Sequence, residues 1–81
     1  EVSTIYPNPA FNSVNVLLGG QANDFIISIF SIDGNLIEQF KDQHLPSNRT
    51  FTIPLDYYPK GVYLINVICG DKIENIKLLK R

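Results

Sequence analysis

Apolar and polar residues alternate along this chain, and turn residues interrupt the alternation at intervals of about eight to twelve residues. Ser13–Leu18 alternates as one strand, and Phe25–Ile32 is rich in isoleucine and phenylalanine. Further strands are expected at Leu36–Phe40, Thr50–Leu55, Val62–Ile68 and Lys72–Lys80. Apolar residues nowhere follow the i, i+3, i+4, i+7 spacing of an amphipathic helix over three turns. The pattern predicts an all-β fold of about six or seven strands.

Turn residues indicate how these strands connect. Asp33-Gly34 separates two apolar runs, and an Asp-Gly pair suits a type I′ hairpin turn, which needs positive φ at both central positions. Pro54 indicates a strand end or an edge strand, because proline has no N–H to donate to a neighbouring strand. The segment Tyr6-Pro7-Asn8-Pro9 is expected to be extended or to turn, because each proline fixes φ.

The alternation also predicts which side chains are buried. Asn66 indicates the solvent face of its strand, and Lys77 is expected to point outward from the last one. The inward positions on these two strands are Tyr63, Ile65, Val67, Ile76 and Leu78. Two sheets packed face to face would bury such residues. The predicted architecture is an immunoglobulin-like antiparallel β-sandwich.

Size and composition limit the chain to one domain and exclude several classes of function. The chain has 81 residues, of which 44% are hydrophobic, and this is enough for one thin core. The net charge of −1 and the absence of a long basic run argue against a nucleic-acid-binding module. No apolar stretch approaches the roughly 20 residues of a membrane helix. No signal peptide is recognisable, so if the parent protein is exported, its export signal is expected upstream.

The residues argue against an enzyme and against a metal or cofactor site. His44 is the only histidine, is expected in a solvated loop, and has no candidate nucleophile or metal-ligand partner nearby. The turn aspartates would suit calcium, but no Asp-x-Asp-x-Asp spacing occurs. Cys69 is the only cysteine and is expected to be a small buried hydrophobe. Tyr57-Tyr58 forms either an aromatic platform for sugar or peptide or, as we favour, a pair with one packed ring.

Four motifs follow one another over nearly the whole chain. They are Tyr6-Pro7-Asn8-Pro9 with the strand Val14–Leu18, then Ile27–Ile37 around Asp33-Gly34, then Ile53–Leu55 leading into Pro59–Val67, and the ending Lys77-Leu78-Leu79-Lys80-Arg81. In this order they resemble the type A C-terminal sorting domain of the type IX (Por) secretion system of Bacteroidetes-type bacteria. The resemblance assigns a scaffold role to Pro7, Asn8, Pro9, Asp33, Gly34, Gly61 and Tyr63. Gly34 and Gly61 are expected where φ is positive or space is short, and Tyr63 is expected to be buried with its hydroxyl bonded.

The resemblance implies that the domain is a sorting signal without catalysis of its own. Such domains direct a larger cargo, which has crossed the inner membrane and folded in the periplasm, through an outer-membrane translocon. A sortase-like protease then usually removes the domain and often joins the cargo to surface lipopolysaccharide. The expected partners are therefore the translocon, the protease and an upstream cargo domain, and the expected location is secreted or at the cell surface. Residues 1–5 are interpreted as a linker remnant from the cargo, and residues 6–81 as the sorting domain.

The last strand is the candidate recognition site. Residues Lys77, Leu78, Leu79, Lys80 and Arg81 combine basic and apolar side chains. At a sheet edge, their backbone would pair with a receptor strand by β-augmentation. Alternatively, the apolar residues close the core, and the lysines only block aggregation at the edge.

An immunoglobulin-like module that binds carbohydrate or protein at the cell surface is the alternative function, because the same architecture serves both roles. A sorting signal would end the natural protein at or near Arg81. An adhesive module could lie anywhere along a chain and could recur.

Overall fold

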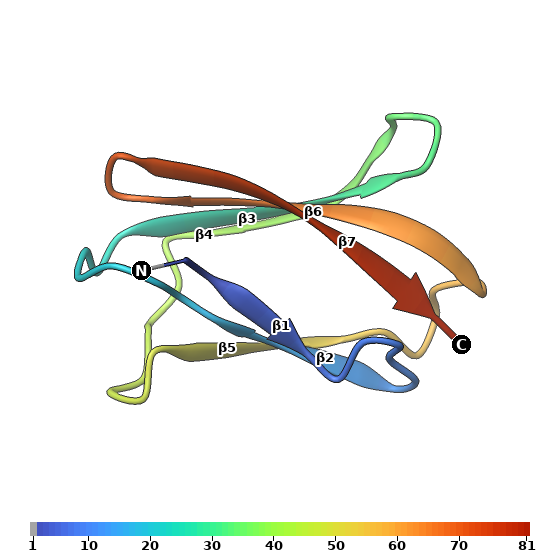
Figure 1. Cartoon of the computed structure of the whole chain (residues 1–81), viewed down its shortest axis with the longest axis horizontal. Coiled ribbons are helices and arrows are strands. Elements are labelled where there is room, and N and C mark those ends of the chain that lie inside the picture. Colours follow the sequence, from blue (N-terminus) through green and yellow to red (C-terminus); the bar gives the residue numbers. More distant parts are fainter. Residues whose placement is uncertain (1) are drawn as a thin grey trace.

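The computed structural model describes residues 2–81, which form two antiparallel sheets packed face to face (Figure 1). The strands in this range are β1 (Thr4–Tyr6), β2 (Ser13–Leu17), β3 (Phe25–Ser31), β4 (Leu36–Lys41), β5 (Thr50–Pro54), β6 (Gly61–Cys69) and β7 (Lys72–Lys80). One sheet has the order β1-β2-β5, and the other has the order β4-β3-β6-β7. The predicted all-β sandwich is confirmed.

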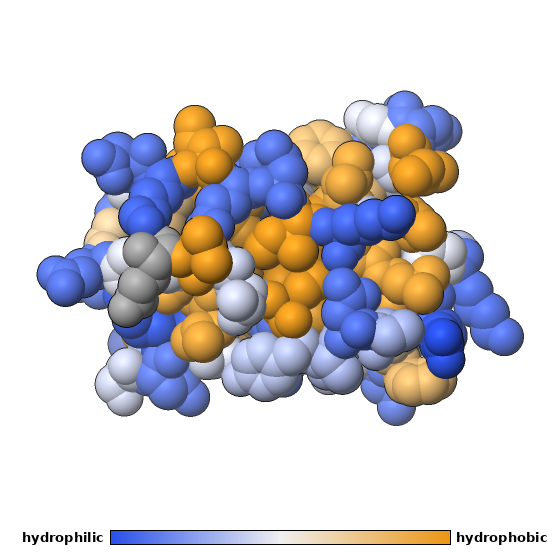
Figure 2. All heavy atoms as spheres, viewed as in Figure 1, coloured by the Kyte–Doolittle hydropathy of each residue, from blue (hydrophilic) through white to orange (hydrophobic). Residues whose placement is uncertain are grey.

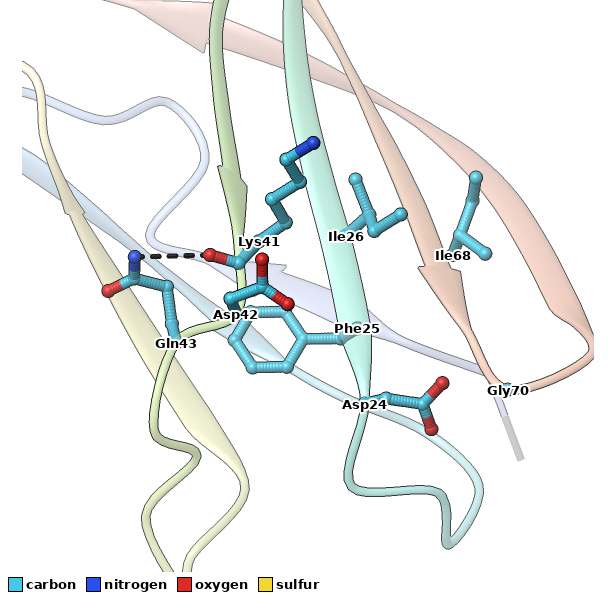
Figure 3. Close-up of a pocket in the computed structure, with 8 residues that line it drawn as sticks. All are labelled: Asp24, Phe25, Ile26, Lys41, Asp42, Gln43, Ile68 and Gly70. Atoms are coloured by element: carbon cyan, nitrogen blue, oxygen red, sulfur yellow. Dashed lines mark hydrogen bonds between the residues drawn. The ribbon is translucent and has the colours of Figure 1, made fainter.

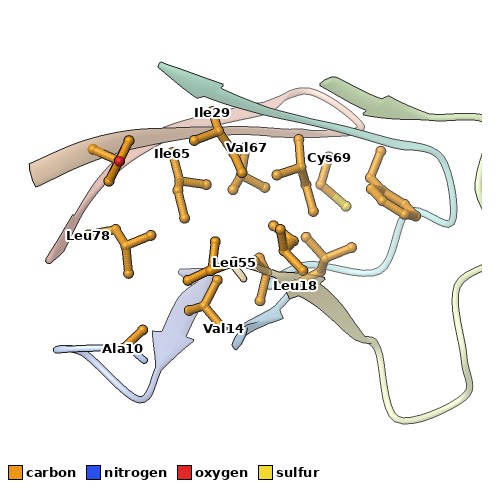
Figure 4. Close-up of a cluster of buried hydrophobic side chains, with 14 residues drawn as sticks. Ala10, Val14, Leu18, Ile29, Leu55, Ile65, Val67, Cys69 and Leu78 are labelled. Atoms are coloured by element: carbon orange, nitrogen blue, oxygen red, sulfur yellow. The ribbon is translucent and has the colours of Figure 1, made fainter. Parts of the chain in front are cut away.

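The inward side chains of the two sheets form a single core (Figure 4). Isoleucine and valine dominate it, since β-branched residues pack well on a pleated surface. From the larger sheet Ile29, Ile65, Val67 and Leu78 point toward Val14, Leu18 and Leu55 on the opposite side of the core. The predicted inward positions Tyr63, Ile65, Val67 and Leu78 are buried, Ile76 is partly buried, and Lys77 is exposed.

The hairpin at Asp33-Gly34 forms, but its turn differs from the predicted type I′. Gly34 has a φ of 91°, whereas the only non-glycine residues with positive φ in the described range are Asp42 and Arg49. The Ser31 N–H donates to the Asn35 carbonyl at 2.9 Å, which closes a loop of three residues between them. Such a loop needs positive φ only at its last residue, so Gly34 alone satisfies it.

The short strand β1 was not predicted. It pairs with β2 through Thr4↔Leu17 and Tyr6↔Asn15, and at three residues it is too short to show alternation. Ser3, just before it, is buried, and its N–H donates to both carboxylate oxygens of Glu74, at 3.0 and 2.9 Å. Residues 3–5 therefore pack on the sandwich, while the point at which a cargo linker would end stays a prediction.

Four strands within residues 2–81 lie at sheet edges, and two of these edges, β5 and β7, bear on the predictions from the sequence. β5 pairs only with β2, which explains why Pro54 is tolerated there. β7 is the outer strand of the four-stranded sheet, as the recognition hypothesis required. Figure 1 shows β7 running along the open side of the sandwich near β1 and ending at the C-terminus.

Candidate functional site

Residues Lys77–Arg81, which we call the tail, end β7 with their side chains in two environments. Leu78 is fully buried in the core. Leu79 is 36% exposed, and Lys77 and Arg81 are also exposed. Lys80 pairs with Gly61 at the start of β6, and its ammonium donates to the Arg81 carbonyl at 2.9 Å. Leu78 therefore closes the core, whereas Lys77, Leu79 and Arg81 are available to a partner.

A segment from the other end of the chain covers the free edge of the tail. The Ala10 N–H donates to the Leu79 carbonyl at 2.8 Å, and the Arg81 N–H donates to the Ala10 carbonyl at 2.7 Å. The Asn8 side chain donates to the Lys77 carbonyl at 2.9 Å and accepts from the Leu79 N–H at 3.0 Å. The Asn8 amide thus acts as one peptide unit of a neighbouring strand. We call residues Asn8–Ala10 the clamp.

The two prolines of the Pro-Asn-Pro motif explain how this short segment lies against β7. Proline has no N–H, so neither Pro7 nor Pro9 leaves a donor unpaired beside the strand. Both the Tyr6–Pro7 and the Asn8–Pro9 peptide bonds are cis. Ala10 is fully buried, and a larger side chain there would meet the core. In this placement the Pro-Asn-Pro motif holds the tail, the last of the four motifs, in position.

The clamp changes the recognition hypothesis. Strand addition needs free N–H and C=O groups along an edge. The outward-facing groups from the Lys77 carbonyl to the Arg81 N–H are already bonded to Asn8 and Ala10. A receptor strand would have to displace the clamp before pairing with the tail. In this structure the exposed side chains are the part of the tail that a partner reaches directly.

The remaining motif residues lie in two places, the β3–β4 turn and the start of β6, where Gly61 and Tyr63 pair with Lys80 and Leu78 of the tail. Asp33 and Gly34 form the β3–β4 turn, and no hydrogen bond in the described part of the chain links them to the tail. Gly61 has a φ of 149°, so its expected positive φ is confirmed. Tyr63 is buried, and its hydroxyl donates to the Pro59 carbonyl, also as expected.

The two adjacent tyrosines do not form a shared platform. Tyr57 is 97% exposed, whereas the Tyr58 ring packs edge-on against Tyr63 with centroids 5.4 Å apart. The Tyr58 hydroxyl donates to the Glu38 carboxylate at 2.6 Å. Burial raises the pKa of Tyr58, and the hydrogen bond to Glu38 raises it further. The favoured arrangement of one packed and one exposed ring is therefore confirmed.

The structure gathers no catalytic constellation in the range that it describes. His44 is exposed in a loop, and Cys69 is buried with its thiol 3.5 Å from the Ala22 carbonyl. Between residues 2 and 81, no three His, Cys, Asp or Glu side chains are grouped so that they could hold a metal ion. The same range contains no helix that is long and apolar enough to cross a membrane.

A pocket of about 210 Å³ lies at the end of the larger sheet remote from the tail (Figure 3). Phe25, Ile26 and Ile68 form its apolar part, and Asp24, Lys41 and Asp42 form its polar part. This volume is below the range of about 300–1,000 Å³ that is typical of small-molecule sites.

These features define a small β-sandwich module that holds an exposed terminal strand in a fixed position. The family model described as a secretion system C-terminal sorting domain matches residues 4–81. The chain therefore belongs to this family, the C-terminal sorting domains of the type IX secretion system. No curated protein matches the chain. The family consists of sorting signals rather than catalysts, and the proteins that carry them are secreted or located at the cell surface.

Proposed function

We propose that this domain directs an upstream cargo protein from the periplasm through the type IX outer-membrane translocon, and that the translocon recognises the clamped tail. The clamp is the observation that carries the proposal. Hydrogen bonds from Asn8 and Ala10 hold the outer edge of the tail, while β6 pairs with its inner edge. The tail side chains are thereby presented from a strand that is bonded on both sides.

Such a tail binds a partner at a lower entropic cost than a free one. The last residues of a domain are usually poorly ordered unless something ties them down. Ordering a flexible side chain at an interface costs about 0.5–1.5 kcal/mol, and fixing the backbone of one residue costs about 1–2 kcal/mol. Folding of the sandwich has already fixed the backbone of Lys77, Leu79 and Arg81. A larger share of the energy of contacts between these exposed side chains and a partner therefore contributes to binding affinity than in a flexible tail.

Processing after translocation belongs to the same proposal. A sortase-like protease removes the domain and joins the cargo to surface lipopolysaccharide. Proteases cut exposed and flexible segments. Ser3 is held by Glu74 and, through its hydroxyl, by the Gly19 N–H at 3.0 Å. The cleaved bond accordingly lies on the N-terminal side of Ser3.

Secretion of a reporter tests this function. The reporter carries an ordinary N-terminal export signal and these residues at its C-terminus, in a bacterium with a working type IX system. Deleting the whole tail would remove Leu78 from the core and would confuse misfolding with loss of the signal. The test variant therefore replaces only Lys77, Leu79 and Arg81 with serine. The matched control replaces exposed Lys41 and Ile73 on the same sheet.

We expect the unchanged domain and the control to deliver the reporter to the surface or medium, and the tail variant to leave it folded in the periplasm. Retention of the unchanged, folded fusion would refute the sorting function and favour a binding module. Normal secretion of the tail variant would refute recognition through the tail alone.

A further inference from the structure

The outward face of the four-stranded sheet carries an apolar patch next to the tail. The strand register places Leu36, Phe30 and Leu64 in one row that ends at Lys77. The next row contains Val62 and Leu79. Leu36 is 53% exposed, Leu64 38% and Leu79 36%. We call Phe30, Leu36, Val62, Leu64 and Leu79 the outer patch.

The outer patch is separate from the remaining apolar surface of this face. A polar row lies beside it, in which Gln39 donates to Ser28 at 3.0 Å and Asn66 donates to Asn75 at 3.1 Å. This row shows that the middle of the face is suited to water, as is usual for the exposed side of an antiparallel sheet. Beyond it, another apolar row ends at Ile73, which is 68% exposed. Ile73 is therefore a matched reference position on the same face.

Two exposed basic residues lie at the rim of the outer patch: Lys77 ends its first row, and Arg81 follows Leu79 by two positions. At the end of the molecule where β6 begins and β7 finishes, the basic residues are Lys60, Lys77, Lys80 and Arg81, and the acidic residues are Asp33, Glu38 and Asp56. Strand alternation turns Lys80, next to Leu79, and Glu38, opposite inward-facing Ile29, away from the outer patch. This local excess of positive charge contrasts with the net charge of −1 of the whole chain. No ion pair joins these four basic groups to a carboxylate in the described residues. In Figure 2 hydrophobic and hydrophilic side chains alternate over this end.

We propose that the outer patch docks on a protein surface that is apolar at its centre and acidic at its rim, and that this surface belongs to the receptor that recognises the tail. The inference rests on the proposed function and extends the recognition site from the tail onto β3, β4 and β6. A few well-packed residues near the centre of an interface supply most of the binding energy, and charges at the rim set orientation and association rate.

The charge distribution also decides against a second copy of the chain as the occupant. A symmetric dimer brings the same patch of each copy together. Both copies would then bring their exposed Lys77 and Arg81 to the rim of the same interface. Like charges that face one another across an interface cost several kcal/mol. An acidic partner removes this repulsion.

The test uses the same reporter fusion with one substitution at a time. Leu36→Glu and Leu64→Glu place a negative charge in the outer patch, and Ile73→Glu places it at the reference position. We expect the two patch variants to lower surface reporter at least about tenfold, which corresponds to about 1.4 kcal/mol. The reporter should accumulate in the periplasm with native protease resistance. Ile73→Glu should be secreted like the unchanged domain, and Leu64→Lys should be less harmful than Leu64→Glu.

Several results would overturn the inference. If the patch variants are secreted as efficiently as the unchanged domain, docking through the patch is wrong while the sorting function stands. If the unchanged fusion stays in the periplasm in a folded form, both the sorting function and docking through the outer patch are refuted. Binding of the purified domain to phosphatidylglycerol vesicles that Leu64→Glu abolishes would make the occupant a lipid surface. A dimer in sedimentation velocity that Leu64→Glu dissociates would make it a second copy.

Discussion

The side-chain Oδ1 of Asn8 accepts a hydrogen bond from the backbone N–H of Leu79 at 3.0 Å, although 71 positions separate the two residues in sequence. The Nδ2 group of Asn8 donates to the Lys77 carbonyl two positions earlier in the same strand. One side chain therefore joins the beginning of the domain to its end. The order of the tail depends on a residue that lies outside it.

Asn8→Ala should loosen the tail without unfolding the domain. The substitution removes two exposed hydrogen bonds, and each contributes about 0.5–1.5 kcal/mol. We expect a loss of about 1–3 kcal/mol in the free energy of unfolding and faster hydrogen exchange at the Leu79 amide. Asn12→Ala, at another exposed asparagine, is the matched control. Unchanged exchange at Leu79 would show that the backbone bonds of Ala10 hold the tail alone.

Neighbouring residues of the tail should differ sharply in their effect on stability. Leu78 is fully buried, so Leu78→Ala should lower the free energy of unfolding by about 2–5 kcal/mol. Leu79→Ala removes a partly exposed side chain and should cost about 1 kcal/mol or less. Thermal or urea unfolding measures both values. Equal losses would mean that the register of β7 differs from the one described.

The stability of the domain should fall at alkaline pH because of Tyr58. Its raised pKa means that the folded state holds the phenolic proton more tightly than the unfolded state does. Stability is then fully present below the ordinary tyrosine pKa of about 10 and decreases as pH rises above it. Tyr58→Phe should reduce this decrease in urea titrations between about pH 9 and pH 11. An identical pH dependence in the variant would assign the effect to other groups.

Glu74 should set the point at which proteolysis from the N-terminus stops. Its carboxylate accepts the Ser3 N–H, and Ser3 in turn binds Gly19. Limited digestion with a protease of broad specificity should therefore stop before Ser3. In Glu74→Ala the cut should move into β1, whereas Asp71→Ala in the β6–β7 turn should leave it unchanged. Mass spectrometry of the fragments identifies the cleaved bond, and a cut beyond Tyr6 in the unaltered domain would contradict the prediction.

Six of the seven strands in the described range were predicted because each has at least five residues and an alternating or strongly apolar pattern. β1 was missed because a strand of three residues is too short to show an alternating pattern. The predicted turn type at Asp33-Gly34 was wrong because a two-residue loop is only one of the hairpin loops that an Asp-Gly pair permits. The contact between Asn8 and the tail was not predicted. It depends on the pairing of segments far apart in sequence, and the only local signal was an asparagine between two prolines.

Under the proposed function, the clamp makes the sorting signal conformational rather than linear. A peptide copied from Lys77–Arg81 has the same side chains, but it lacks Asn8, Ala10 and the β6 backbone that hold them in place. A ribosome that stops early, or a sandwich that fails to close, leaves the two ends of the domain apart. If the translocon recognises the clamped tail as proposed, export would require that synthesis and folding of the domain are complete before the cargo crosses the outer membrane.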